Sequence, residues 1–227
     1  MASLSPLIDQ KRRAAEAAVA EIEPGMLVGL GTGSTAAFAI AALGRRVAGG
    51  LAVRAVATSL ATEAAAVAAG IAMLDFADVA AVDLVIDGAD EVDPALRAIK
   101  GAGGALLREK IVAESAGRML CIIDDSKRVS QLGRGPLPVE VLPFARRFVT
   151  DRLAALGCEP VLRVRAGAPV LSDQGNLLID CRFGPIDAPA ALADQLAALP
   201  GVMGHGLFLR EIDFLFCGGE LRQERDR

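Results

Sequence analysis

The chain has 227 residues, enough to bury one large domain or a large domain that carries a small one. Its formal net charge of −4 and its lack of tryptophan and tyrosine argue against a nucleic-acid partner, because such surfaces use basic stripes and stacking aromatic rings. We therefore expect a small-molecule ligand. No apolar stretch reaches the ~20 residues that a membrane-spanning helix needs, so we expect no membrane partner.

The N-terminus and the cysteines indicate a cytoplasmic protein. The opening stretch, "MASLSPLIDQKRRAAEAAV", soon becomes charged and helix-periodic and lacks the apolar core of a signal peptide. The cysteines stand far apart without a C-x-x-C pair, which predicts reduced, packed thiols at Cys121, Cys158, Cys181 and Cys217. His205 cannot build a multi-histidine metal site without other histidines, so we expect no metal.

In the first half, short apolar runs alternate with alanine-rich helical stretches. The runs lie at 26–33, 53–59, 71–76, 82–88 and 118–124, and the helical stretches at 34–43, 60–70 and 104–117. This alternation is typical of a Rossmann-like, mostly parallel sheet with helices on both faces. Ligands of such sheets gather at the carboxyl ends of the strands.

From about residue 133 the pattern changes, and the glycine and proline stretch "LGRGPLPVEVLP" opens the new region. The order becomes β-α-β-β-α-β, with strands at 138–143, 159–165, 176–183 and 201–209 and helices at 145–157 and 188–200. This order is typical of a ferredoxin-like α+β module. The last apolar run, 211–219, should return to the first sheet, so we predict a catalytic domain of 1–132 plus 206–227 and an inserted small domain of 133–205.

The stretch "GLGTGST", Gly29 to Thr35, lies where the first strand should give way to a helix. It lacks the third glycine of the dinucleotide fingerprint, because Ser34 stands there, and it lacks the Gly-Lys-Ser/Thr of a nucleoside triphosphatase. Backbone amides at a helix start, beside the hydroxyls of Thr32, Ser34 and Thr35, suit a phosphate monoester. The alternative is a tight turn with an ordinary N-cap.

The stretch "VDLVIDGADEVD" predicts a buried strand that ends at Asp87 and is followed by Asp90, Glu91 and Asp93. At the carboxyl end of a parallel strand, Asp87 and Asp90 would face the same crevice as the glycine loop. Acids are also common in turns for local structural reasons, and we interpret Glu91 and Asp93 in that way.

Helical phase singles out Glu109. At 100° per residue it projects from the middle of an apolar arc of about 120°, which is formed by Ala105, Leu106, Val112, Ala113 and Ala116. Arg108 and Lys110 fall outside this arc. An acid on an apolar face must be paired, neutralised or functional, and burial would raise its pKa toward that of a useful general base. The alternative is a carboxylate paired with a lysine at the edge of the core.

Lys100 and the following "GAGG" add a positive charge and a run of backbone amides between the aspartates and Glu109. Together these are the parts for abstracting a proton next to a carbonyl. The carboxylate would be the base, and the amides and the ammonium would stabilise the developing enediolate oxygen.

Four stretches resemble motifs of the ribose-5-phosphate isomerase A family, in order and with matching spacing: "GLGTGSTAAFAI", "DGADEVDPALRAIKGAGGALLREK", "IDDSKRV" and "LPVEVLPFA". The resemblance covers nearly the whole chain, including "GNLLID" and "LPGVMGHGLF". It implies interconversion of ribose 5-phosphate and ribulose 5-phosphate in the pentose phosphate pathway, through a cis-enediolate and without a metal or organic cofactor. It also implies a homodimer or, as in some family members, a dimer of such dimers.

The resemblance assigns catalytic roles to Glu109 as the base, to Asp87 and Asp90 in ring opening, and to Lys100 in ring opening or at the oxyanion. The implied substrate-binding residues are Lys11, Thr32, Gly33, Ser34, Thr35, Asp87, Gly88, Ala89, Asp90, Lys100, Gly101, Ala102, Gly103 and Lys127. Ala102 departs from the family pattern, where glycine is common, and should be tolerated unless the position needs a positive φ.

Two alternatives stay open. A metal-dependent isomerase that works by hydride shift would need a cluster of His, Asp and Glu ligands, which a single histidine makes poor. A sugar-phosphate-sensing regulatory module on a related fold would need the phosphate loop but not Glu109 together with Asp87 and Asp90.

Overall fold

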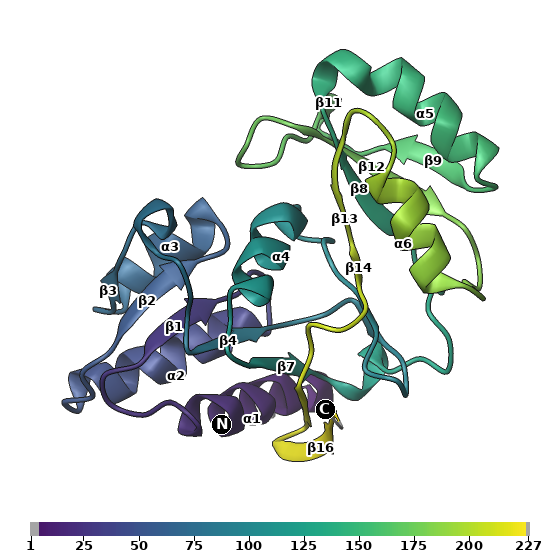
Figure 1. Cartoon of the computed structure of the whole chain (residues 1–227). Coiled ribbons are helices and arrows are strands. Elements are labelled where there is room, and N and C mark those ends of the chain that lie inside the picture. The colour runs from purple at the N-terminus through teal and green to yellow at the C-terminus, as the bar shows by residue number, and fades with distance from the viewer. Residues whose placement is uncertain (1–4, 226–227) are drawn as a thin grey trace. The chain divides into compact units, whose positions relative to one another are not determined.

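The structure, a computed structural model, describes residues 5–225. It divides into two compact units (Figure 1). Of the described residues, 5–89, 108–128 and 210–225 form the first unit, and Asp90–Leu107 and Val129–Leu209 form the second. Within residues 5–225, no helix is both long and apolar enough to cross a membrane.

A seven-stranded sheet forms the centre of the first unit, in the order β16-β15-β7-β4-β1-β2-β3. Its strands are β1 (Leu27–Leu30), β2 (Arg54–Ala57), β3 (Ala72–Met73), β4 (Leu84–Asp87), β7 (Met119–Ile123), β15 (Phe214–Cys217) and β16 (Glu220–Glu224). All neighbours pair in parallel except β15 and β16. The mostly parallel sheet is therefore confirmed, and so is the return of the last apolar run to it.

Both faces of this sheet are covered (Figure 1). The helices of the unit are α1 (Pro6–Ala20), α2 (Ala36–Ala48), α3 (Leu60–Ala68) and the part of α4 (Leu106–Glu114) from Arg108 onward, with short 3-10 turns η1 (Phe76–Asp78) and η2 (Asp125–Lys127). On one face, Leu30 and Ile86 pack in a core with residues of α1 and α2. On the other, Gly29 and Val85 lie against Val112 of α4, as the alternation of a strand requires.

A four-stranded antiparallel sheet forms the centre of the second unit, in the order β13-β8-β12-β9. Its elements are β8 (Leu137–Val141), η3 (Pro143–Ala145), α5 (Arg146–Ala155), β9 (Glu159–Leu162), β12 (Leu177–Arg182), α6 (Pro189–Ala197) and β13 (Val202–His205). The predicted order β-α-β-β-α-β is present, with an added small hairpin of β10 (Val164–Arg165) and β11 (Ala168–Pro169). Its core includes Val139, Leu153, Ile179 and Leu196.

A second, three-stranded sheet of the second unit joins β5 (Glu91–Val92), β6 (Ala98–Ile99) and β14 (Leu207–Phe208). In this sheet β6 pairs with β14, and residues 90–107 and 206–209 belong to the second unit, whereas the sequence placed both stretches in the catalytic domain. The predicted bounds of the two domains, 1–132 plus 206–227 for the catalytic domain and 133–205 for the small one, stay a prediction. All four cysteines are buried free thiols, as predicted.

Candidate functional site

Asp87 is the last residue of β4, and the glycine loop begins directly after β1, the neighbouring parallel strand. Oδ1 of Asp87 accepts hydrogen bonds from the backbone N–H of Thr32 at 3.1 Å and of Gly88 at 2.7 Å. Asp87 is 1% exposed. The predicted meeting of this carboxylate and the glycine loop at the carboxyl edge of the sheet is therefore confirmed.

The start of α2 gathers a cation and two hydroxyls. Thr35 occupies the N-cap position of α2, but its side chain makes no capping hydrogen bond. The alternative prediction of an ordinary serine or threonine N-cap is therefore wrong for this helix. The Ser34 hydroxyl accepts a hydrogen bond from Nζ of Lys11 at 3.0 Å. Nζ of Lys11 also lies 3.7 Å from Oδ2 of Asp124. Exposed Gly33 and Ser34 leave the amide-rich helix start open to an anion.

The hydroxyl of Thr32 points into a cluster that the sequence did not reveal. It lies 2.8 Å from the hydroxyls of Thr58 and Ser59 and 3.2 Å from that of Thr62. The Thr62 hydroxyl in turn donates to the carbonyl of Gly31 at 2.9 Å. The run "TSLAT" after the second strand was the available signal. These hydrogen bonds hold the backbone of the glycine loop in one conformation.

Lys127 ends η2, the turn that follows β7 at the same carboxyl edge of the sheet. Its backbone N–H donates to the carbonyl of Asp124 at 3.1 Å, and its side chain is half-buried. Gln10 of α1 donates to Oδ2 of Asp125 at 2.7 Å. This bond attaches α1, which carries Lys11, to the turn that carries Lys127.

Glu109 lies on α4 with its side chain 3% exposed, and Val112 and Ala113 of the same helix are buried with it. Arg108 and Lys110 are only half-buried. The inward orientation that helical phase predicted for Glu109 is thus confirmed. Lys110 forms an ion pair with Glu211 at 3.1 Å.

The second unit carries Asp90, Lys100 and the glycine turn. Oδ2 of Asp90 accepts a hydrogen bond from the backbone N–H of Ala102 at 2.9 Å. The Lys100 side chain is buried, with its ammonium 5.3 Å from the centre of the Phe208 ring. Burial of an ammonium is costly, and the ring face offers it partial compensation.

The turn after Lys100 relies on two glycines with a positive φ, Gly101 and Gly104. Gly101 has a φ of +106°, which glycine adopts without strain. Among the described residues, the positive-φ positions held by other residue types are Leu96 and Ala166. Ala102 therefore needs no positive φ, and alanine at this position is tolerated as expected.

Of the two acids interpreted as loop acids, Asp93 does lie in the turn between β5 and β6, whereas Glu91 needs correction because it lies in a strand; both are buried. Glu91 lies in β5 and accepts hydrogen bonds from the backbone amides of Gly133 at 2.8 Å and Gly135. Asp93 accepts from the backbone and the guanidinium of Arg97 at 2.9 and 2.6 Å. Their carboxylates anchor local backbone, which agrees with their exclusion from the site.

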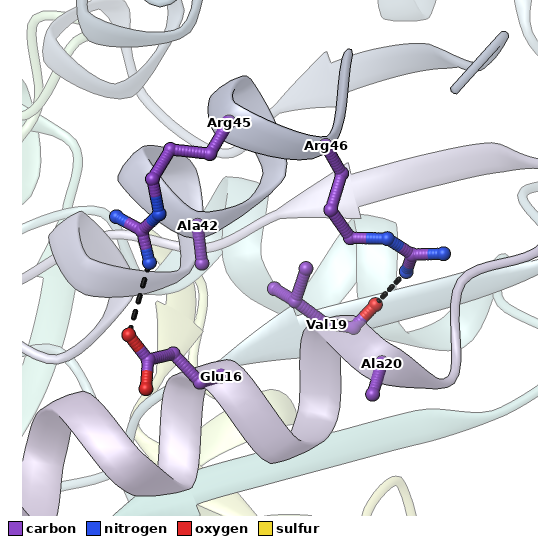
Figure 2. A pocket seen from close by; sticks show the side chains of 6 residues that line it. All are labelled: Glu16, Val19, Ala20, Ala42, Arg45 and Arg46. Atoms are coloured by element: carbon purple, nitrogen blue, oxygen red, sulfur yellow. Dashed lines mark hydrogen bonds and ion pairs between the residues drawn. The ribbon is translucent and has the colours of Figure 1, made fainter. Parts of the chain in front are cut away.

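A groove of about 490 Å³ lies in the first unit between α1 and α2. Figure 2 shows its lining, in which Arg45 pairs with Glu16 at 2.9 Å and Arg46 donates to the carbonyl of Val19. None of the predicted site residues lines it. With its cations already engaged by the protein, it is no candidate for the sugar phosphate site.

The geometry agrees with the comparisons to known proteins. The model of the family "Ribose 5-phosphate isomerase A (phosphoriboisomerase A)" matches residues 54–221. The chain belongs to this family. It is 49% identical to ribose-5-phosphate isomerase A of Sphingopyxis alaskensis over 225 residues, which cover 99% of each chain.

Solved structures of the family share the fold. A D-ribose-5-phosphate isomerase in complex with phospho-erythronic acid is 37% identical with a TM-score of 0.89, covering 92% of this chain and 93% of that one. Ribose 5-phosphate isomerase A from Methanocaldococcus jannaschii is 38% identical with a TM-score of 0.86, covering 90% and 92%. These relatives are isomerases, so the alternative of a sugar-phosphate-sensing module gains no support.

Proposed function

We propose that the protein interconverts D-ribose 5-phosphate and D-ribulose 5-phosphate by proton transfer through a cis-enediolate. The observation that carries the proposal is Glu109, a carboxylate buried on an apolar helix face in a chain of this family. In the forward direction the base removes the proton from C2 of the open-chain aldose and returns it to C1. Over the same step O1 gains a proton and O2 loses one, so no electrons leave the substrate.

Glu109 acts as the base because it is the acid that α4 turns inward. Asp87, fixed by two backbone amides, and Asp90, fixed by the amide of Ala102, bind sugar hydroxyls and move the protons of ring opening. The Lys100 ammonium and the amides of Gly101 and Gly103 stabilise the negative charge that develops on oxygen, a contribution of about 10²- to 10³-fold for each donor.

The phosphate binds at the start of α2. Three polar groups lie beside the first amides of this helix: the Lys11 ammonium, the Ser34 hydroxyl and the Thr35 hydroxyl, which makes no capping hydrogen bond. The helix dipole at this end favours an anion. Gly33 leaves space for close approach, Thr32 shapes the loop, and Lys127 adds a second cation from the turn after β7. Gly88 and Ala89 complete the backbone lining next to Asp87.

Phospho-erythronic acid, which the solved relative contains, should bind this chain as well. It carries a phosphate at one end and a planar carboxylate at the other, and so resembles the enediolate in charge and shape. We expect it to inhibit competitively with ribose 5-phosphate.

The decisive assay compares ribose 5-phosphate with arabinose 5-phosphate, its C2 epimer, by coupling ribulose 5-phosphate formation to a second enzyme. Fast turnover of ribose 5-phosphate and at most slow turnover of its epimer support the proposal. Tight binding of either sugar without turnover would instead favour a sensing module.

Self-association into a homodimer is part of the proposal. Apolar side chains are exposed around the end of β8 and the start of α5, with Phe144 96% and Phe148 47% exposed. Exposed apolar clusters of this kind mark protein interfaces. Light scattering after gel filtration should give twice the chain mass, and a Phe144→Ser variant should shift it toward the monomer.

We also propose that the enzyme works in the cytoplasm. Four buried free thiols suit a reducing compartment. Cell fractionation with an antibody against the chain tests this location, and recovery from a secreted fraction would contradict it.

A further inference from the structure

Arg163, between β9 and β10 of the second unit, forms a two-pronged ion pair with Asp180 of β12. Its Nε donates to Oδ2 at 2.9 Å and its Nη2 to Oδ1 at 2.5 Å. The side chains of Arg163 and Asp180 are 16% and 24% exposed. A bidentate contact of this kind fixes both the position and the plane of the guanidinium.

The remaining end of the guanidinium holds the glycine turn. Nη1 of Arg163 donates to the carbonyl oxygens of Gly101 at 3.1 Å and Ala102 at 3.0 Å. In a planar trans peptide, the C=O and the following N–H point in opposite directions. Arg163 therefore turns the N–H groups of Ala102 and Gly103 away from itself.

Asp90 lies on the side to which these amides point. The N–H of Ala102 donates to Oδ2 of Asp90 at 2.9 Å, so a carboxylate oxygen already occupies the first of the two donors. Successive N–H groups that point the same way form a concave site for anionic oxygen. The guanidinium on the carbonyl side also polarises both peptide groups, which strengthens their N–H donors.

We infer that Arg163, held by Asp180, is a positioning residue that aims the amide of Ala102 at Asp90 and the amide of Gly103 at the oxygen of the developing enediolate. The inference rests on the proposed isomerase activity and adds two residues that the sequence did not single out. Arg163 acts through the turn and not on the substrate itself. Because the charge on oxygen develops only in the transition state, its contribution belongs to kcat and not to KM.

The test is steady-state kinetics on Arg163→Met, Asp180→Asn and the double variant, with ribose 5-phosphate as substrate. Loss of one direct oxyanion donor costs about 10²- to 10³-fold, so misaimed donors in Arg163→Met should lower kcat by about 10- to 100-fold with KM nearly unchanged. Asp180→Asn should lower kcat less, and the double variant should be no slower than Arg163→Met, because Asp180 acts through Arg163.

Arg147→Met is the matched control. It removes an exposed arginine–aspartate pair of the same unit, Arg147–Asp151 at 2.9 Å, and should leave kcat unchanged. If Arg163→Met does not fold, Asp180→Asn and Arg163→Lys carry the test, since each keeps a positive side chain at position 163.

An unchanged kcat in the folded variants, or a loss that appears only in KM, would overturn the positioning role. So would additive losses in the double variant. A wild-type protein that does not isomerise ribose 5-phosphate would instead refute the proposed function, so the two failures are distinguishable.

Discussion

A β-carbon added to Gly31 would lie 1.9 Å from Oδ1 of Asp87. Glycine at the end of the first strand is thus required by the carboxylate beside it, because no side chain fits between them. Because Gly31 has no side chain, the Asp87 carboxylate can come close to the backbone there and accept a hydrogen bond from the amide of Thr32, the next residue of the glycine loop.

Gly31→Ala should therefore displace the Asp87 carboxylate and break its bonds to the loop. We expect a loss of about 1–3 kcal/mol in the free energy of unfolding and a fall of at least about 10²-fold in kcat, because a displaced catalytic group loses its alignment. Denaturant titration and the coupled assay measure the two. Gly49→Ala is the control, since its β-carbon would meet nothing closer than 3.3 Å. Equal behaviour of the two variants would refute the steric argument.

Lys11→Met should weaken binding of the phosphate. Removal of a charge-assisted hydrogen bond to phosphate costs about 1.5–3 kcal/mol, so KM for ribose 5-phosphate should rise at least about tenfold. Arg13→Met, which removes a more exposed cation from the same helix, should leave KM unchanged. A Lys11→Met enzyme with the wild-type KM would remove Lys11 from the phosphate site.

The pair of Lys110 and Glu211 should make stability depend on pH. Burial acts to raise the pKa of Glu211, but the Lys110 ammonium and the Arg210 amide lower it below the usual value of 4.5. A lowered folded-state pKa stabilises the protein above about pH 4.5 and loses this effect as the pH falls through the folded value.

Glu211→Gln should thus reduce the free energy of unfolding by about 1–2 kcal/mol at pH 7, and the difference from wild type should shrink below pH 4.5. Denaturant titrations across this range measure it. Glu220→Gln, which alters an exposed pair, should show no such difference. A Glu211→Gln effect of the same size at every pH would mean that the ionised carboxylate is not its source.

Activity should survive exhaustive chelation, because the proposed proton transfer uses side chains and amides alone. The coupled assay after dialysis against a chelator measures this. Complete loss of turnover that one divalent ion restores would favour a metal-dependent mechanism.

The sequence revealed what depends on local periodicity. Helical phase placed Glu109 inward, and the ends of parallel strands brought Asp87 to the glycine loop, because both follow from geometry within one or two elements. The change to an antiparallel module near residue 133 and the return of the last strand were visible in the same way.

Contacts that depend on distant partners were not visible. Glu91 is buried by amides 42 residues further on, at Gly133, and Arg163 reaches a carbonyl 62 residues earlier, at Gly101. Such bonds arise from the register of strands and the path of turns, which hydrophobic patterns do not encode. The hydroxyls of Thr58 and Thr62 around Thr32 belong to the same class.

The most direct test follows the proton itself. Ribose 5-phosphate is converted in D₂O by wild type, by Glu109→Gln and by Glu114→Gln, an exposed acid on the same helix, and the products are examined by NMR. We predict deuterium at C1 of ribulose 5-phosphate for wild type and for Glu114→Gln. In a folded Glu109→Gln variant, the turnover rate should fall by about 10²- to 10⁴-fold. Product with deuterium at near-wild-type rate from Glu109→Gln would contradict the assignment of Glu109 as the base.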